Sequence, residues 1–412
     1  MPLPGLLVPR LRRGLALAFV LLVGLGAGVT AGVYADQAYP DQLPLLAPRA
    51  SAKGLDQATF NRALQIIHND YYDPRPSYAN LSHGTVRGLV EGLNDRFSYY
   101  LDPAEYQRQL NSYAGQYTGI GVEVTNNADY PVVDTVFPDS PAAKSGLRPG
   151  DVIIKIDGQD VHGQNSDQTS NLIRGKAGTT VLITVDRGGE HLDLPVVREP
   201  ITIPSVRSVK LEGNVLYIRI YSFGDSTAAD FDKALKDGLP GEKGVILDLR
   251  NDGGGFIDAA QNVISQFVSS GEAFELRDHS GHVDRHNVSG NPPAASIPVV
   301  VLVNANTASA SEMVSGSLSA HHRAKLVGTV TFGKGSVQQD FPLPDGSDLH
   351  ITIRRWFLPD GSSVEQKGLT PTVGAKLANP AEMYDAGKPE LGHAKDTQLN
   401  AALQLLGVSS AA

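Results

Sequence analysis

A serine at the end of an apolar run is the first candidate for chemistry in this sequence. Residues 299–303 are all apolar and are typical of a buried strand; a turn of small residues follows, and Ser309 stands where a helix is predicted to begin. Such a junction places a side chain beside the backbone N–H groups of a helix N-terminus, which favour an anion. The alternative is that Ser309 or Ser311 only caps the helix.

A lysine between two glycines is the second candidate. Lys334 follows Ser309 further along the chain and has Gly333 and Gly335 on either side. A lysine can take the proton of a serine hydroxyl, and so prepare it for acyl transfer, only if desolvation lowers the lysine pKa toward neutrality. Flanking glycines permit the close packing that would bury this lysine. The alternative is a lysine in a solvated turn.

The same lysine ends a segment that partly matches a phosphate-binding loop. Four residues separate Gly328 from Gly333, and Lys334 follows. Gly335, however, occupies the position of the Ser or Thr that would hold Mg²⁺, and the intervening residues are strand-like. The sequence therefore disfavours nucleotide binding.

A glutamine and a glycine-rich loop are expected to assist the pair. Gln338 is four positions after Lys334, so on one strand both side chains would point to the same face, and Gln338 would orient the ammonium. Residues 245–249 are typical of another buried strand, and Gly253–Gly255 follow it closely. Backbone amides of such a loop can be directed at an oxyanion. The alternative is a tight turn into a helix near Asp258.

Composition removes several other classes of chemistry. The chain has no cysteine, which excludes disulfides, zinc–thiolate sites and cysteine nucleophiles. Its net charge of −9 gives no basic stripe for nucleic acid. His279, His282 and His286 are close in sequence, but polar neighbours favour an exposed loop over a metal site. We therefore expect no metal and no cofactor.

The N-terminus has the pattern of an export segment. Arg10, Arg12 and Arg13 precede an uncharged run over 14–35, and about 20 apolar residues span a hydrocarbon core. Positive residues hold that end in the cytoplasm, so the remainder is predicted to be exported to the cell envelope or periplasm. Val33 and Ala35 suit a signal-peptidase cut. A cleaved signal and a retained anchor both stay open, with a buried helix as the third alternative.

Changes in periodicity predict a multidomain α+β protein. The segments are a signal or anchor (1–35), a linker (36–50), a helical N-terminal domain (51–114), a mostly β module (115–198), a core of alternating strands and helices (199–380) and a C-terminal tail with a helix (381–412). Alternation of strands and helices in the core indicates a largely parallel sheet.

Taken together, these segments resemble the carboxy-terminal processing proteases, also called tail-specific proteases, from about residue 55 to 375. The resemblance rests on the order and spacing of several short motifs: 247–251, 308–312, 323–324, 327–328, 331–335 and 337–338. It implies Ser309 as nucleophile, Lys334 as general base and Gln338 as the third member of the site. It also implies an oxyanion hole from the amide of Ala310 and a glycine of the loop, Gly254 or Gly255.

Two positions depart from the family pattern. The loop is Asn-Asp-Gly-Gly-Gly instead of the common Asn-Pro-Gly-Gly, which leaves the donating glycine open. Ala320 occupies the position at which some members carry an acidic residue, which disfavours a triad that uses an aspartate.

The β module resembles a PDZ domain. The segment 119–124 matches the loop and strand that bind a peptide's terminal carboxylate, and turns near 140–143 and 146–151 match those of PDZ domains. The resemblance implies that a peptide adds as a strand beside Val122, with amides near Gly119, Ile120 and Gly121 taking the carboxylate. Arg174 is expected to take part in peptide binding and to couple this module to the core. A purely structural β module is the alternative.

The sequence thus predicts an exported serine endopeptidase that selects unfolded or tail-exposed proteins by their C-termini. It is also expected to associate with a membrane through its N-terminal segment and to form a homodimer, without nucleic acid as a partner. The rival interpretation is a membrane-tethered PDZ adaptor with an inactive protease core, and the intact Ser309, Lys334 and Gln338 argue against it.

Overall fold

The computed structural model describes residues 56–73, 77–125, 129–137, 140–202, 204–379, 382–384, 386–387 and 392–408. The chain divides into two units, residues 1–78 and 79–412. The predicted export segment and linker, residues 1–50, lie outside the described residues.

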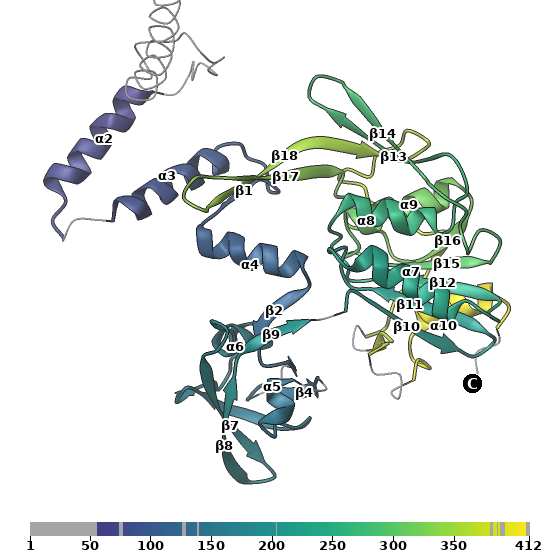
Figure 1. Ribbon diagram of the computed structural model, residues 1–412, viewed down its shortest axis with the longest axis horizontal. Helices are drawn as coiled ribbons and strands as arrows, with labels where there is room; N and C mark the ends of the chain where they lie inside the picture. The colour runs from purple at the N-terminus through teal and green to yellow at the C-terminus, as the bar shows by residue number, and fades with distance from the viewer. Residues whose placement is uncertain are drawn as a thin grey trace, which may run out of the picture. The chain divides into compact units, whose positions relative to one another are not determined.

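Helix α2 (Gln57–Asp70) is the main described element of the first unit (Figure 1). Asp56 caps it by accepting from the Thr59 amide at 3.0 Å. Phe60, Leu64 and Ile67 recur at helical spacing, as predicted, but no residue of α2 is buried. An apolar helix face is therefore exposed within this unit.

The second unit starts with two helices and a short strand. These are α3 (Tyr78–Glu91), β1 (Tyr99–Leu101) and α4 (Pro103–Tyr113). Asp102 and Glu105 form a capping box at the start of α4, with Pro103 in its first turn, which confirms the predicted helix start. The strand β1 was not predicted: it pairs with β18 (Asp348–Phe357), so the helical domain assigned to 51–114 contributes a strand to the core.

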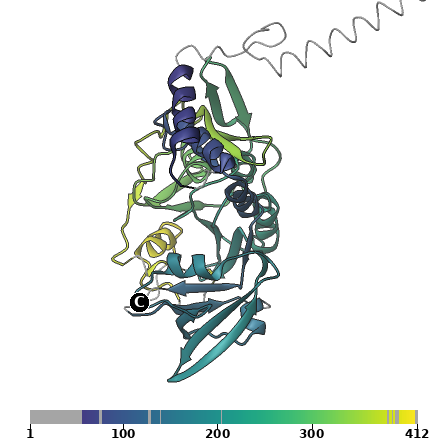
Figure 2. The ribbon, with the colours of Figure 1, turned by 90° about the vertical axis from the view of Figure 1, so that its left-hand side faces the viewer.

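The PDZ-like module is a β structure around its own apolar core. Its strands are β2 (Gln116–Gly119), β3 (Val122–Thr125), β4 (Val132–Val136), β5 (Val152–Ile156), β6 (Gln159–Asp160), β7 (Thr180–Arg187), β8 (Glu190–Val197) and β9 (Glu199–Thr202), with helices α5 (Pro141–Lys144) and α6 (Ser166–Ile173). The sheet order is β3-β4-β5-β7-β8, and β2 pairs with β9. Figure 2 shows the long β7–β8 hairpin in teal. The module thus extends a few residues past the predicted end at 198.

The core contains the predicted parallel sheet. Its order is β10-β11-β12-β15-β16-β19, and all pairs except β10–β11 are parallel. The strands are β10 (Val206–Leu211), β11 (Val215–Ile220), β12 (Gly244–Asp248), β15 (Val299–Val303), β16 (Ala324–Gly328) and β19 (Val373–Gly374). The residues of β11, β12 and β15 are all buried, because helices cover both faces of a parallel sheet and favour continuous apolar runs.

Helices cover the two faces of this sheet unequally. One apolar cluster joins it to α7 (Thr227–Gly238), α8 (Ile257–Ser265) and α9 (Ala310–Ala320). A second cluster joins the opposite face to α10 (Thr397–Leu405). Leu399, Ala402 and Leu403 are fully buried there. The helix expected in the C-terminal tail is therefore part of the core.

A second sheet of the core is antiparallel and was not predicted. Strands β13 (Glu272–Asp278), β14 (Val283–Asn287) and β17 (Ser336–Pro342) join β1 and β18 in it. In it, β18, which carries His350, pairs both with β17, which follows the lysine segment, and with β1, which carries Tyr99.

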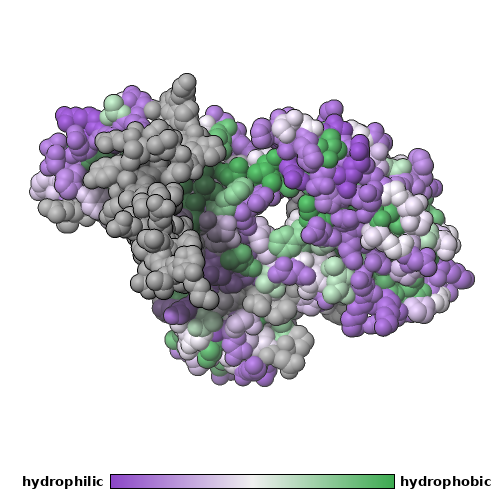
Figure 3. Space-filling model, turned by 45° about the horizontal axis from the view of Figure 1, so that its top comes forward, coloured by the Kyte–Doolittle hydropathy of each residue, from purple (hydrophilic) through white to green (hydrophobic). Residues whose placement is uncertain are grey.

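Exposed apolar side chains are concentrated near the start of the described chain. Hydrophilic residues dominate the coloured surface in Figure 3, with hydrophobic residues in small groups. Large apolar side chains at least 36% exposed include Phe60, Ile66, Tyr72, Leu89 and Leu93, all within α2, α3 and their flanks.

Candidate active site

Two loops at the carboxyl ends of β12 and β15 form the floor of the site. Ligand sites of parallel sheets lie at these ends. The Thr307 hydroxyl donates to the Leu249 carbonyl at 2.8 Å, and the Ala308 amide donates to the Asp252 carbonyl at 3.0 Å. The two loops are thereby fixed side by side.

Ser309 has an unusual backbone conformation at the junction between β15 and α9. Its φ is +55° and its ψ is −118°, a region that non-glycine residues seldom occupy. Strain of this kind persists where the surroundings impose it, often at functional sites. Ser309 is 9% exposed, and Gly254 packs so closely against it that a Cβ on Gly254 would lie 2.9 Å from the Ser309 Cβ.

Lys334 lies in the segment between β16 and β17. Burial lowers the pKa of its ammonium, Asp95 and Glu312 act in the opposite direction, and Arg96 reinforces the decrease. The Lys334 Nζ lies 4.9 Å from the centre of the Phe97 ring. Its carbonyl accepts from the Trp356 indole at 2.9 Å, which fixes the backbone from which the side chain extends.

Gln338 lies in the same site as Lys334, but the strand alternation that predicted this is not the reason. Lys334 precedes β17, and a bulge separates Val337 from Gln338, so the alternation of an unbroken strand does not apply. The Gln338 amide donates to the hydroxyls of Ser336 at 2.9 Å and Thr352 at 3.0 Å. Among the described residues, its hydrogen bonds thus go to these two hydroxyls and not to Lys334.

The candidate residues open onto one cleft of about 400 Å³. Ser309, Lys334, Gln338, Gly254 and Gly255 all line it. The remainder of the wall includes Gly253 of the predicted loop, Val337 of the 337–338 motif and His350, together with residues that had no predicted role: Tyr99, Tyr113, Phe256, Ile257, Ser336 and Asp340. His350 stacks on Tyr99 with ring centres 4.5 Å apart and bonds Asp340. These residues come from strands far apart in sequence, so no local motif signals them.

Hydrogen bonds within the loop at 251–255 favour one of the two glycines predicted as oxyanion donors. The Gly254 N–H donates to Asp252 Oδ1 at 2.8 Å, so this amide is already engaged. Phe223 bonds the Gly254 carbonyl and the Phe256 amide, in a parallel bridge with Gly255. In such a bridge the residue's own N–H lies on the opposite edge. Gly255, together with the buried Ala310 at the start of α9, is therefore the better candidate.

Glu312 belongs to the 308–312 motif, but no role was predicted for it from the sequence. Its buried carboxylate accepts four hydrogen bonds: Oε2 from the amides of Ser309 (3.0 Å) and Lys334 (2.9 Å), and Oε1 from Thr331 Oγ1 (2.6 Å) and the Gly333 amide (2.7 Å). One oxygen thus joins the backbones of both candidate catalytic residues. The signal was present as Ser309 followed three residues later by glutamate at a helix start.

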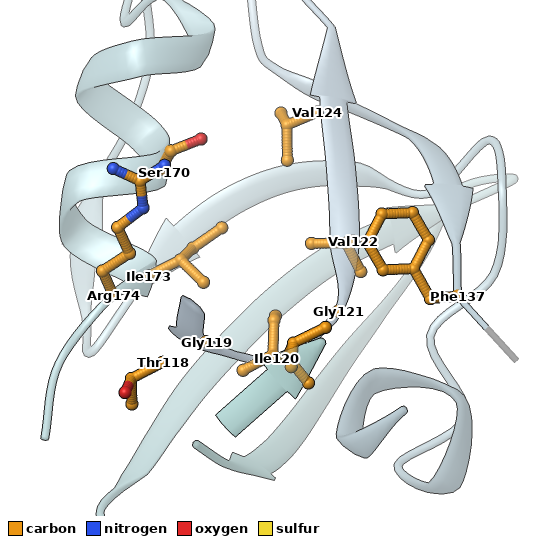
Figure 4. Close-up of a pocket in the computed structure, with 11 residues that line it drawn as sticks. Thr118, Gly119, Ile120, Gly121, Val122, Val124, Phe137, Ser170, Ile173 and Arg174 are labelled. Atoms are coloured by element: carbon orange, nitrogen blue, oxygen red, sulfur yellow. The ribbon is translucent and has the colours of Figure 1, made fainter. Parts of the chain in front are cut away.

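The PDZ-like module contains a separate groove of about 150 Å³. Its lining includes the predicted Gly119, Ile120, Gly121, Val122 and Arg174. Figure 4 shows the groove between α6 and β3, with Ile173 pointing toward Ile120 and Val122. Arg174 lies at the C-terminal end of α6 and extends back along the helix toward Ser170. The predicted peptide-binding residues are thus together in one groove.

Comparisons with known proteins agree with this division. The model of peptidase family S41 matches residues 214–375, and that of the PDZ domain matches 118–197. A carboxy-terminal-processing protease of Bartonella bacilliformis is 35% identical over 336 residues, which cover 78% of this chain and 77% of that protein. The chain belongs to peptidase family S41.

A solved structure extends the likeness to three dimensions. The photosystem II D1 C-terminal processing protease is 30% identical, with a TM-score of 0.50 over 84% of this chain and 92% of that one. The S41 protein is thus a serine-type, C-terminal processing peptidase with a PDZ domain. The interpretation as an inactive adaptor is disfavoured accordingly.

Among the helices of the S41 peptidase that the structure describes within residues 56–408, none combines the length and the apolar character of a membrane span. The predicted signal or anchor at 14–35 lies outside them.

Replacing Glu312 by glutamine is expected to lower the kcat/KM of the S41 peptidase by about 100-fold or more. The amide retains one acceptor oxygen, and in either orientation its NH₂ faces at least one backbone N–H, either that of Gly333 or those of Ser309 and Lys334. At least one of the four bonds is therefore replaced by a contact between two donors, and the site loosens. Glu365→Gln is the matched control, because among the described residues the Glu365 carboxylate accepts from a single backbone amide, that of Gly335, and pairs with the exposed Arg355. We expect less than a tenfold loss there. A folded Glu312→Gln enzyme as active as the control contradicts the assignment.

Proposed function

We propose that this peptidase cleaves peptide bonds of exported proteins through an acyl-enzyme on Ser309, with Lys334 as general base and its PDZ domain as the reader of substrate C-termini. One observation carries the proposal: Ser309 and Lys334 line the same cleft, and a single Glu312 oxygen holds the backbone amides of both. Family membership supplies the reaction class.

In the proposed acylation, neutral Lys334 takes the proton of the Ser309 hydroxyl while the Ser309 Oγ attacks the scissile carbonyl carbon. The carbonyl oxygen becomes an oxyanion, which the amides of Ala310 and Gly255 receive. The Lys334 ammonium then returns its proton to the leaving amine as the C–N bond breaks. In deacylation, Lys334 takes a proton from water, whose oxygen attacks the ester, and returns it to Ser309 Oγ.

Burial prepares Lys334 for this role. A base must be neutral in the resting enzyme, and desolvation lowers the pKa of the Lys334 ammonium toward the range in which that form is populated. Gln338 carries no charge that would reverse this effect. Its bonds to Ser336 and Thr352 support a role in shaping the cleft wall next to Lys334.

The PDZ groove supports recognition of an apolar C-terminal residue. Ile120, Val122, Phe137 and Ile173 supply apolar lining, and the backbone near Gly119–Gly121 offers amides for the terminal carboxylate. A tail would add as a strand beside β3, across from α6 (Figure 4). Arg174 lines the same groove, and its positive charge adds attraction for an anionic peptide end.

Amidating the C-terminus of a model substrate is expected to lower its kcat/KM by about tenfold or more. Amidation removes the negative charge that the groove amides and Arg174 would receive, and leaves the scissile bond unchanged. The measurement compares the acid and the amide of one peptide, with Arg174→Ala as a second variant in which the difference between them should shrink. Equal kinetics for acid and amide would contradict tail recognition, while cleavage of either form still supports the protease.

Export and membrane association are part of the proposal and rest on the sequence of residues 10–35. Fractionation of cells should recover the peptidase in the envelope or periplasm, and recovery in the cytoplasm contradicts this part. We also propose a homodimer, supported by the exposed Phe60, Leu64 and Ile67 on α2, because an apolar helix face of this kind favours a partner. Sedimentation of the full chain as a monomer contradicts it.

A further inference from the structure

Asp252 is a buried acid that the proposed mechanism does not use. Its side chain is fully buried beneath the oxyanion loop, and Oδ1 accepts the Gly254 N–H at 2.8 Å. Oδ2 is also buried and, among the described residues, has no hydrogen-bond partner. The Ser311 hydroxyl in the first turn of α9 is also buried, and it is close enough to the Asp252 carboxyl to lower its pKa.

A buried carboxyl with incomplete hydrogen bonding destabilises the folded protein, so its presence here points to a function. Burial raises the pKa of Asp252 to about 7, although the Gly254 amide, the Ser311 hydroxyl and the charge of Arg219 act to lower it; the nearby Asp248 raises it further. Arg219 is the cation on the adjoining β11, and Asp248 ends β12. Buried polar groups that remain partly unsatisfied are concentrated at functional sites.

The position of Gly254 shows what this carboxyl controls. Gly254 has a φ of +95°, and a Cβ there would lie 2.7 Å from both the Ala308 carbonyl oxygen and the Ala310 amide nitrogen. On either side of Gly255, the Gly254 carbonyl and the Phe256 amide are both hydrogen-bonded to the backbone of Phe223. Asp252 thus fixes the amide on one side of Gly254, and Phe223 fixes the carbonyl on the other.

We propose that Asp252 is a positioning residue for the oxyanion hole: its carboxyl holds the Gly254 amide, and thereby orients the Gly255 amide toward the oxyanion that forms at Ser309. This role rests on the proposed function. Asp252 touches no reacting atom, and it acts through the conformation of Gly254. The Asp252 main-chain carbonyl, which accepts from Ala308, ties the same residue to the serine loop.

The test compares Asp252→Ala with Asp252→Asn in the full chain. Alanine removes the acceptor, whereas asparagine keeps a carbonyl oxygen that can accept from Gly254. Loss of one oxyanion donor typically costs about 10²–10³ in kcat. We therefore expect Asp252→Ala to lose about 100-fold or more in kcat with KM within about threefold, and Asp252→Asn to stay within about tenfold of the parent in kcat.

A peptide aldehyde supplies a readout that a merely structural role would not move. Its hemiacetal with Ser309 places an oxygen where the oxyanion forms, so its inhibition constant should rise with the loss of kcat in Asp252→Ala. Binding of a tail peptide to the PDZ groove should be unchanged in the same variant. If alanine prevents folding, Asp252→Leu replaces it, because leucine fills the space without an acceptor.

The outcomes separate this inference from the proposed function. A parent enzyme that cleaves no peptide overturns the proposed function and this role with it. An active parent overturns the role alone if Asp252→Ala keeps its kcat and aldehyde affinity, or if folded Asp252→Asn loses as much as Asp252→Ala.

Discussion

Ser309→Ala and Lys334→Ala are each expected to abolish proteolysis, by about 10⁴-fold or more in kcat, while the protein stays folded. Nucleophile and base act as one unit, so the loss of either removes nearly all of the chemistry. Alanine at 309 also keeps the Ser309 amide that Glu312 holds, so the loop geometry should persist. Cleavage of an unfolded protein, together with circular dichroism and thermal unfolding of each variant, provides the measurement.

Controls for these two variants come from the same surroundings. Ser317→Ala removes a buried hydroxyl that, among the described residues, has no partner in the same helix α9. Lys325→Ala removes an exposed lysine from the strand that precedes the Lys334 segment. Both are expected to keep full activity. Substantial cleavage by purified Ser309→Ala would remove Ser309 from the mechanism.

Lys334→Arg is expected to be inactive at every pH at which the protein is folded, whereas the parent enzyme gains activity as pH rises. The neutral lysine is the active form, so activity should increase through an apparent pKa below the ordinary value of about 10.4 and then stay high. Arginine keeps the positive charge and cannot lose its proton at usable pH. The pH dependence of kcat/KM for both proteins provides the measurement.

A histidine base would also give a rise near neutrality, so the arginine variant decides between the two. Three histidines of the core are the alternatives to Lys334 as the base: His350 lines the cleft, His321 bonds the Glu272 carbonyl at 2.7 Å, and His322 is exposed. Strong activity of Lys334→Arg would exclude Lys334 as the base, and His350→Ala would be the next variant to measure.

Local sequence was sufficient for the elements that end in the site. Strand β15 and helix α9 follow from an apolar run and the helical spacing after it, and their junction located Ser309. Lys334 was recognisable from its two glycines. Gln338 was placed in the right cleft by an incorrect argument, because a bulge cannot be seen in side-chain alternation.

The cleft wall was not predictable from local sequence. Tyr99 and His350 are brought together by the pairing of β1 with β18, and a three-residue strand between helices has too little periodicity to be recognised. Gly254 was one of two predicted oxyanion donors, whereas Asp252 had no predicted role. Which of the loop's amides is free depends on the Gly254–Asp252 hydrogen bond, which composition does not reveal.

Arg250 gives the site an unusual dependence on the far end of the chain. Arg250 lies two residues after the end of β12, and its guanidinium is fully buried and bonds Asp248. The guanidinium also donates to Asp396 and Gln398, 146 and 148 residues later in the chain, each at 3.0 Å. Until a ribosome has produced those two residues, an arginine beside the oxyanion loop lacks two of its partners, and a buried charge left short of partners is strongly unfavourable. The packing around the loop at 251–255 is therefore complete only in a chain that includes residues 396–398.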